Sequence, residues 1–228
     1  MQRALDSGNL KEAVKHATSL ISELRTSLLS PKHYYELYMT VFDELSYLES
    51  FFMEEYRKGK SMAELYETVQ HVSNVLPRLY LLITVGSVYI KTRELPANDI
   101  LKDLLEMVKG VQHPIRGLFL RYYLNKICKD KLPDKGNEYE GEGGTTEDSI
   151  EFILTNFSEM NRLWIRMQHT GHVKDKVKRE KERSDLRVTV GENIIRLSNL
   201  EGVTLEIYKA HVLPKILETV TTAKDTIS

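Results

Sequence analysis

The stretch Leu76-Pro77-Arg78-Leu79-Tyr80-Leu81-Leu82 opens the most apolar segment of the chain and decides its fold class. The residue before a proline is disfavoured in the α-helical region, so a helix break near Leu76 and a new start at Pro77 are predicted. From Leu79 to Ile90 the sequence LYLLITVGSVYI is apolar around the whole helix, which is typical of a helix buried among others. Because the helix N-terminus disfavours a cation, we expect an acceptor for the guanidinium of Arg78.

Helical spacing of apolar residues continues on the N-terminal side of this segment. It runs through Leu10, Ala13, Val14, Ala17, Leu20, Ile21, Leu24 and Leu28. Ser30-Pro31 then supplies an N-cap and a first-turn proline for a second helix, which Gly59 ends. Ser61 with Glu64 matches a capping box and predicts a third helix that extends to about Val75.

The same pattern continues on the C-terminal side. Asn98 is predicted to cap a helix over Asp99–Lys109, Gly110 to close it, and His113-Pro114 to open the next one. Further helices are predicted over Glu147–Gln168, over Val173–Leu200 and from Leu205 towards the C-terminus. Pro214 should kink or interrupt the last of them.

Residues 129–147 interrupt the helical pattern. This segment is rich in glycine and acidic residues and poor in large aliphatic ones, so we predict a flexible loop. The glycines at 141, 143 and 144 do not form a phosphate-binding loop, because the lysine and the preceding strand of that motif are missing.

The number of helices indicates the architecture. About nine consecutive helices are too many for a four-helix bundle, and no strand pattern is found, so we predict an all-α, HEAT-like α-solenoid of stacked antiparallel helix pairs. Residues 1–228 are expected to form a single solenoid segment that belongs to a longer array. The segment ALDSGNLKEAVKHA is similar to a tetratricopeptide repeat, but no 34-residue period follows it.

Composition limits the function classes. The net charge of −1 argues against a nucleic-acid-binding protein, and a single cysteine, Cys128, fits a reducing compartment. No segment reaches the roughly 20 apolar residues of a membrane span, and the N-terminus lacks the apolar core of a signal peptide. We therefore expect a cytosolic chain whose contact with membranes is indirect.

Few side chains indicate chemistry. His169 and His172 are three residues apart but lack further metal ligands nearby, so we interpret them as residues of a helix end and turn. The run Lys174–Arg187 mixes bases and acids and predicts a solvated helix face, and Cys128 is expected to be half-buried. No spacing suggests a catalytic triad or a carboxylate pair. We predict no catalytic, metal or cofactor site.

Four segments together carry a family resemblance. They are PRLYLL (Pro77–Leu82), GVQHPIRGLFLRYYL (Gly110–Leu124), ELRTSLLSPKHYYELY (Glu23–Tyr38) and WIRMQHTGH (Trp164–His172). In this order they resemble the N-terminal part of the large solenoid subunit of retromer, the endosomal coat complex that recycles membrane cargo. The resemblance implies a scaffold for endosome-to-Golgi and plasma-membrane retrieval that is peripherally associated with endosomes.

The resemblance also implies partners. The N-terminal part of the family's solenoid binds the arrestin-fold subunit and, with it, a sorting nexin adaptor and cargo; a late-endosomal Rab GTPase is recruited through the same end. The metallophosphoesterase-fold subunit is expected to bind only the C-terminal portion, which this chain lacks. On this basis the candidate partner-binding residues are Pro77, Arg78, Leu79, Tyr80, Leu81 and Leu82, together with Thr92 and Arg93.

Two interpretations of Arg78 remain open. It contacts the partner directly, or it pairs with a carboxylate on a neighbouring helix and holds two repeats together. The second is favoured because the leucines of the motif have the character of core residues. The alternative functions are a tetratricopeptide-like adaptor that binds an extended peptide, and an all-helical hydrolase or transferase, which would need a deep pocket with convergent polar groups.

Overall fold

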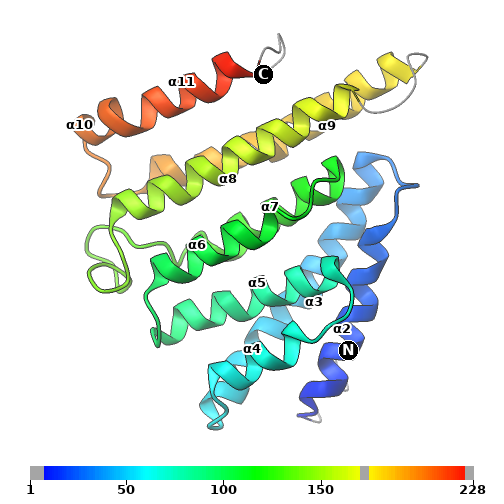
Figure 1. Ribbon diagram of the computed structural model, residues 1–228, viewed down its shortest axis with the longest axis vertical. Coiled ribbons are helices and arrows are strands. Elements are labelled where there is room, and N and C mark those ends of the chain that lie inside the picture. The colour runs from blue at the N-terminus through cyan, green and yellow to red at the C-terminus, as the bar shows by residue number, and fades with distance from the viewer. Residues whose placement is uncertain (1–7, 170–174, 224–228) are drawn as a thin grey trace. The chain divides into compact units, whose positions relative to one another are not determined.

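The structure, a computed structural model, describes residues 8–169 and 175–223. Within these residues it contains nine α-helices of nine residues or more and no β-strand (Figure 1). The chain divides into two compact units, Met1–Leu95 and Pro96–Ser228.

The first unit consists of four α-helices. They are α2 (Leu10–Ser22), α3 (Pro31–Arg57), α4 (Met62–Gln70) and α5 (Val75–Thr92). Helix α5 packs against each of the other three, which places the apolar segment of the sequence at the centre of this unit. Its side chains from Leu79 to Val88 are all buried, as the apolar pattern predicts.

The predicted caps of the first unit are confirmed. The hydroxyl of Ser30 accepts a hydrogen bond from the backbone N–H of His33, and Pro31 occupies the first turn of α3. Ser61 and Glu64 form both hydrogen bonds of a capping box at α4. However, α4 ends at Gln70 and not near Val75, because the Asn74 side chain accepts from the N–H of Leu76 and starts α5 there.

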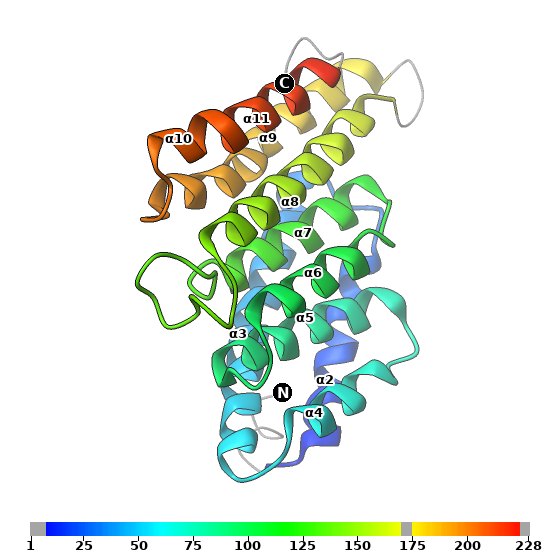
Figure 2. The ribbon, with the colours of Figure 1, turned by 60° about the vertical axis from the view of Figure 1, so that its left-hand side comes forward.

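The second unit contains the remaining helices. They are α6 (Ala97–Val108), α7 (Pro114–Cys128), α8 (Thr146–Arg166), α9 (Lys176–Ile195), the single turn α10 (Leu205–Ile207) and α11 (Leu213–Thr222). Helix α8 packs against α6, α7, α9 and α11, and Figures 1 and 2 both show it running beside α7 and α9.

Two details of this unit differ from or refine the sequence predictions. Asn98 is not an N-cap: α6 starts at Ala97 after Pro96, and the backbone N–H of Asn98 donates to the carbonyl of Gly143 (2.8 Å). Pro214 interrupts the last helix as expected. A π-helical turn, Tyr208–Val212, separates α10 from α11, since proline lacks the N–H that an uninterrupted helix would use.

Residues 129–145 between α7 and α8 form a series of turns with buried anchors. Leu132 is fully buried and Tyr139 is nearly so. The carboxylate of Asp134 accepts hydrogen bonds from the backbone N–H groups of Glu201 (2.8 Å) and Gly202 (2.9 Å), which tie the segment to the turn after α9. The flexibility of this segment in solution stays a prediction.

In each unit, helices pack mainly against helices close to them in sequence. Together with the absence of strands from the described residues, this confirms the predicted all-α, HEAT-like solenoid class. That residues 1–228 act as one continuous segment stays a prediction.

Candidate partner-binding site

The PRLYLL motif occupies the first two turns of α5. Asn74 caps the helix, so Pro77 is the third helical residue and not the first. Proline is tolerated there because the first backbone N–H groups of a helix have no partner within the helix. The N–H of Arg78 is the first of the motif to close a helical bond, to the carbonyl of Asn74 (3.0 Å).

Arg78 is half-buried, and its acceptor is a backbone group. Its guanidinium Nη1 donates to the carbonyl of Val72 (3.3 Å), in the turn between α4 and α5. Within the described residues Arg78 forms no ion pair, so the predicted pairing with a carboxylate on a neighbouring helix is not found there. Because Arg78 satisfies a carbonyl of the preceding turn, it fixes how the chain enters α5.

The apolar members of the motif face the interior. Leu79 is 7% exposed, Leu82 is 5% exposed, and Tyr80 and Leu81 are fully buried. Pro77 is also buried. These side chains are core residues, so the exposed surface at this end of α5 is formed by Arg78 of the motif and by Val75, which precedes the motif and is 51% exposed.

Thr92 and Arg93 lie at the other end of the same helix. Arg93 has a left-handed backbone conformation (φ 57°) and donates its N–H to the carbonyl of Ile90 (3.2 Å), which ends α5. Fourteen residues separate Thr92 from Arg78, or roughly 20 Å of helix at 1.5 Å per residue. The structure therefore does not bring the two predicted parts of the site together.

The end of α5 is anchored electrostatically. The hydrogen bond from Tyr56 on α3 to the carboxylate of Glu94 raises the pKa of the Tyr56 hydroxyl. Burial and the charge of Glu94 also raise the pKa of Tyr89. One turn earlier in α5, the carboxylate of Glu49 on α3 accepts from Ser87 (2.7 Å) and pairs with Lys91 (2.9 Å). These contacts fix α5 against α3.

Sequence reasoning missed two buried arginines. Arg183, in the run predicted to be a solvated face, is 1% exposed; it lies over the ring of Trp164 (4.5 Å) and donates to the Gln168 side chain (3.1 Å). Its neighbours along α9 are mostly exposed, so the solvated-face prediction is wrong at this position. The sequence signal that could have identified Arg183 as buried is the helical period, because Arg183 and Leu186 are three residues apart and lie on the same face of α9.

The second missed residue, Arg121, is fully buried in α7. Its Nη1 donates to the carbonyls of Val111 (3.2 Å) and Gly117 (3.0 Å). Burial lowers the pKa of its guanidinium, the charge of Glu159 partly opposes this, and Arg166 adds to it. Nothing in the sequence distinguishes Arg121 from an exposed arginine. Because α7 is buried on nearly all sides, it has no single apolar face whose spacing would mark the buried positions.

The remaining positions considered from the sequence are the histidines of QHTGH and Cys128. His172 lies outside the described residues, and no group of three or more His, Cys, Asp or Glu side chains that could hold a metal occurs within residues 8–169 and 175–223. Cys128 is fully buried and not half-buried as predicted, because the last turn of α7 is covered. One described helix, Val75–Thr92, is long and apolar enough to cross a membrane, but 72% of it is buried in the structure.

Comparisons with known proteins agree with the resemblance of the four motifs. The family model described as vacuolar protein sorting-associated protein 35 matches residues 1–228. The chain is 60% identical to vacuolar protein sorting-associated protein 35A of Arabidopsis thaliana, 57% identical to protein 35 of Dictyostelium discoideum and 44% identical to that of Schizosaccharomyces pombe. Each match includes the whole chain but only 28–29% of the relative's length.

A family model that matches every residue, together with three such relatives, leaves no doubt about kinship. The chain belongs to the vacuolar protein sorting-associated protein 35 family.

Proposed function

We propose that this chain is the N-terminal portion of the scaffold subunit of retromer, a non-enzymatic coat component for endosome-to-Golgi and plasma-membrane retrieval. The observation that carries the proposal is the match of the family model over all 228 residues. The helical solenoid supports it, because stacked helices offer broad surfaces for other proteins.

The arrestin-fold subunit is the proposed direct partner. The contact would lie at the N-terminal end of α5, where Val75 is half-exposed and Arg78 orders the turn that contains Val72. The buried side chains of Leu79 to Leu82 would act indirectly, by holding this end of the helix in place. Thr92 and Arg93 would form a separate, second contact.

Further partners follow from the same proposal. A sorting nexin adaptor with cargo would join through the arrestin-fold subunit, and a late-endosomal Rab GTPase would recruit this end of the protein. The metallophosphoesterase-fold subunit would need the part of the relatives that this chain does not include. The chain would then act in the cytoplasm, held on endosomes through these partners.

A pull-down with the purified arrestin-fold subunit tests the proposed contact. We expect Arg78→Ala to weaken binding at least tenfold while the melting temperature falls by only a few degrees, since a single half-buried hydrogen bond contributes about 1 kcal/mol. Arg187→Ala, an exposed arginine on α9, is the matched control and should bind normally.

Two results would contradict the contact at Arg78. Unchanged binding by Arg78→Ala would remove the residue from the interface. A large fall in melting temperature together with lost binding would mean that Arg78 acts only by maintaining the fold. Failure of the wild-type chain to bind would contradict the proposed function itself.

A further inference from the structure

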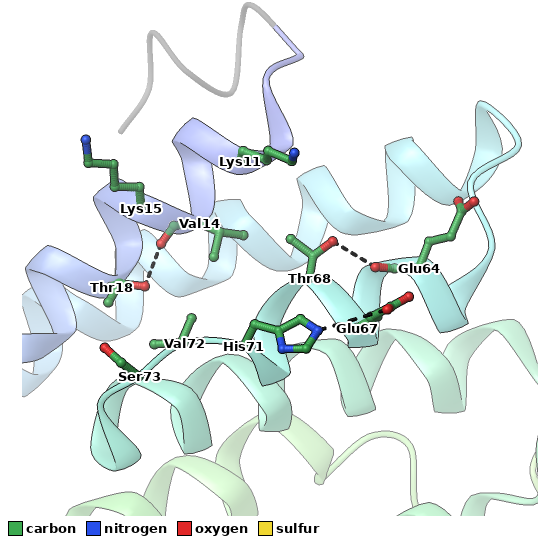
Figure 3. Close-up of a pocket in the computed structure, with 10 residues that line it drawn as sticks. All are labelled: Lys11, Val14, Lys15, Thr18, Glu64, Glu67, Thr68, His71, Val72 and Ser73. Carbon is green, nitrogen blue, oxygen red and sulfur yellow. Dashed lines mark hydrogen bonds and ion pairs between the residues drawn. The ribbon is translucent and has the colours of Figure 1, made fainter.

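An open groove of about 730 Å³ lies in the first unit between α2 and α4. Figure 3 shows side chains of α2 on one side of it and, on the other, side chains of α4 and of the turn that follows. None of the residues predicted from the PRLYLL motif lines it. The groove adjoins the site proposed above at the turn that contains Val72, but its walls are formed by other residues of α2 and α4.

The side chains in the middle of the groove offer mainly apolar surface to a ligand. Val72 and the mostly buried Val14 contribute methyl groups, and Thr18 and Thr68 lie next to them. The hydroxyl of Thr18 donates to the carbonyl of Val14 (2.7 Å) and that of Thr68 to the carbonyl of Glu64 (2.8 Å). Since both hydroxyls are used within their own helices, they offer little to a ligand.

The walls also have few backbone groups to share. Apart from the last turn of α4, the lining residues of α2 and α4 use their N–H and C=O groups in helical hydrogen bonds. In the turn, the N–H of Val72 donates to Val69 (3.2 Å) and its carbonyl accepts from Arg78. An extended peptide would find few partners for its main chain, whereas a helix satisfies its own. The groove therefore favours a helical occupant.

The two walls have opposite charge. Lys11 and Lys15 are one turn apart on α2, both are exposed, and neither forms an ion pair with any described residue. On α4, Glu64 and Glu67 line the other side; Glu67 lies 4.0 Å from His71, and Glu64 takes part in the capping box. A complementary helix would carry carboxylates along one edge and cations along the other.

We propose that this groove binds an amphipathic α-helix of a partner protein. Its apolar face would pack on Val14 and Val72. Its acidic edge would lie along Lys11 and Lys15, and its basic edge would lie along Glu67. This inference does not depend on the proposed function, because it uses only the shape and charge of the first unit.

The test uses two fluorescein-labelled helical peptides of 18 residues with the same apolar stripe. In one, glutamates and lysines flank the stripe in the orientation that matches the groove; in the other, the two flanks are exchanged. By fluorescence anisotropy we expect the 228-residue chain to bind the matched peptide at least tenfold more tightly. The preference should decrease as salt is added, because exposed charges are screened.

Two variants connect the binding to the groove. Lys11→Glu, Lys15→Glu and Glu67→Lys together should reverse the preference in favour of the exchanged peptide. Glu64 stays unchanged, so the capping box is kept. Thr68→Trp should fill the groove and abolish binding of both peptides, while Thr40→Trp, at an exposed position of α3, should bind as the wild type does.

Several outcomes would overturn the proposal. They are equal binding of the two peptides, a preference that the charge-reversed variant does not reverse, and binding that survives in Thr68→Trp. A dimer of the chain that Thr68→Trp dissociates would make a second copy the occupant. Binding by the 228-residue chain but not by full-length protein 35A of Arabidopsis thaliana would assign the groove to a segment of the longer chain.

Discussion

The two compact units bury different kinds of side chains. Among the described residues of Met1–Leu95, the buried polar or charged ones are Glu55, Thr84 and Ser87. Among the described residues of Pro96–Ser228 there are twelve, including Arg121, Asp134, Asn156 and Arg183. The first unit thus has an almost wholly apolar interior, and the second has one that carries charges and amides.

The two units also differ in where their buried polar side chains find hydrogen-bond and ion-pair partners. In the first unit, Glu55 pairs with Lys60 and Lys58 near the surface, and the hydrogen bond from Lys60 lowers the pKa of Glu55 most. In the second, Asn156 donates to the carbonyl of Arg121 (3.1 Å) and to the side chain of Asn193 (3.4 Å), inside the contacts of α7, α8 and α9. Apolar packing stabilises the first; buried hydrogen bonds fix helix positions in the second.

The largest expected effect is on the apolar interior of the first unit. Leu81→Ala removes a fully buried side chain and should lower the free energy of unfolding by about 2–5 kcal/mol. Val75→Ala, half-exposed on the same helix, should change it by less than about 0.5 kcal/mol. Denaturant titration measures both, and similar values for the two variants would contradict the buried position of Leu81.

A glycine pair tests how closely the helices of the second unit approach each other. A Cβ at Gly117 in α7 would lie 2.5 Å from the carbonyl oxygen of Val111 and 2.8 Å from Cδ1 of Leu163. Gly117→Ala should therefore destabilise by about 1–3 kcal/mol. Gly191→Ala in α9, where a Cβ meets nothing within 4 Å, should stabilise by about 0.5–1 kcal/mol. Equal signs in thermal melts would refute the predicted crowding.

Asp134 tests whether a buried charge supports the second unit. Burial alone would raise its pKa, but backbone N–H groups of Gly202, Glu201 and Lys135 and the charge of Arg196 outweigh it, so the pKa is lowered. A carboxyl whose pKa is lower when folded contributes stability above its unfolded pKa and loses it as pH falls through the folded one. Asp134→Asn should cost about 1–2 kcal/mol at pH 7.

The pH profile supplies the control for that experiment. The difference between wild type and Asp134→Asn should shrink as the pH falls below about 4, the ordinary range of an aspartate. A difference that stays constant from pH 7 to pH 3 would mean that shape alone, and not charge, explains the loss.

Apart from the control variants, the smallest effect is expected at Arg121. Its Nε and Nη2 have no hydrogen-bond partner within the described residues, and no carboxylate forms an ion pair with it there. Replacing a buried charge by an apolar side chain of similar length is often neutral or stabilising. Arg121→Met should therefore change stability by at most about 1 kcal/mol. A loss above 3 kcal/mol would mean that its bonds to Val111 and Gly117 are essential to the second unit.

Local signals in the sequence predicted the helices well. Ser30-Pro31, the capping box of Ser61 and Glu64, and His113-Pro114 each mark a helix start, because a cap depends on residues within one turn. The prediction of Asn98 as an N-cap was wrong for the same reason. Its neighbours in the sequence fit a cap, but α6 already starts after Pro96, and the backbone N–H of Asn98 donates to the carbonyl of Gly143. Residue 143 is too far along the chain for a local rule to find.

By itself the sequence determined the helical class, the family and most helix boundaries, because periodicity and capping are local and the four motifs are long. Only the tertiary structure decided that the PRLYLL leucines are core residues, that Arg78 bonds a backbone carbonyl, and that Arg121 and Arg183 are buried. It also decided that α2 and α4 enclose a groove with charged edges. These features depend on which faces of distant helices meet, and spacing along one helix does not specify its neighbour.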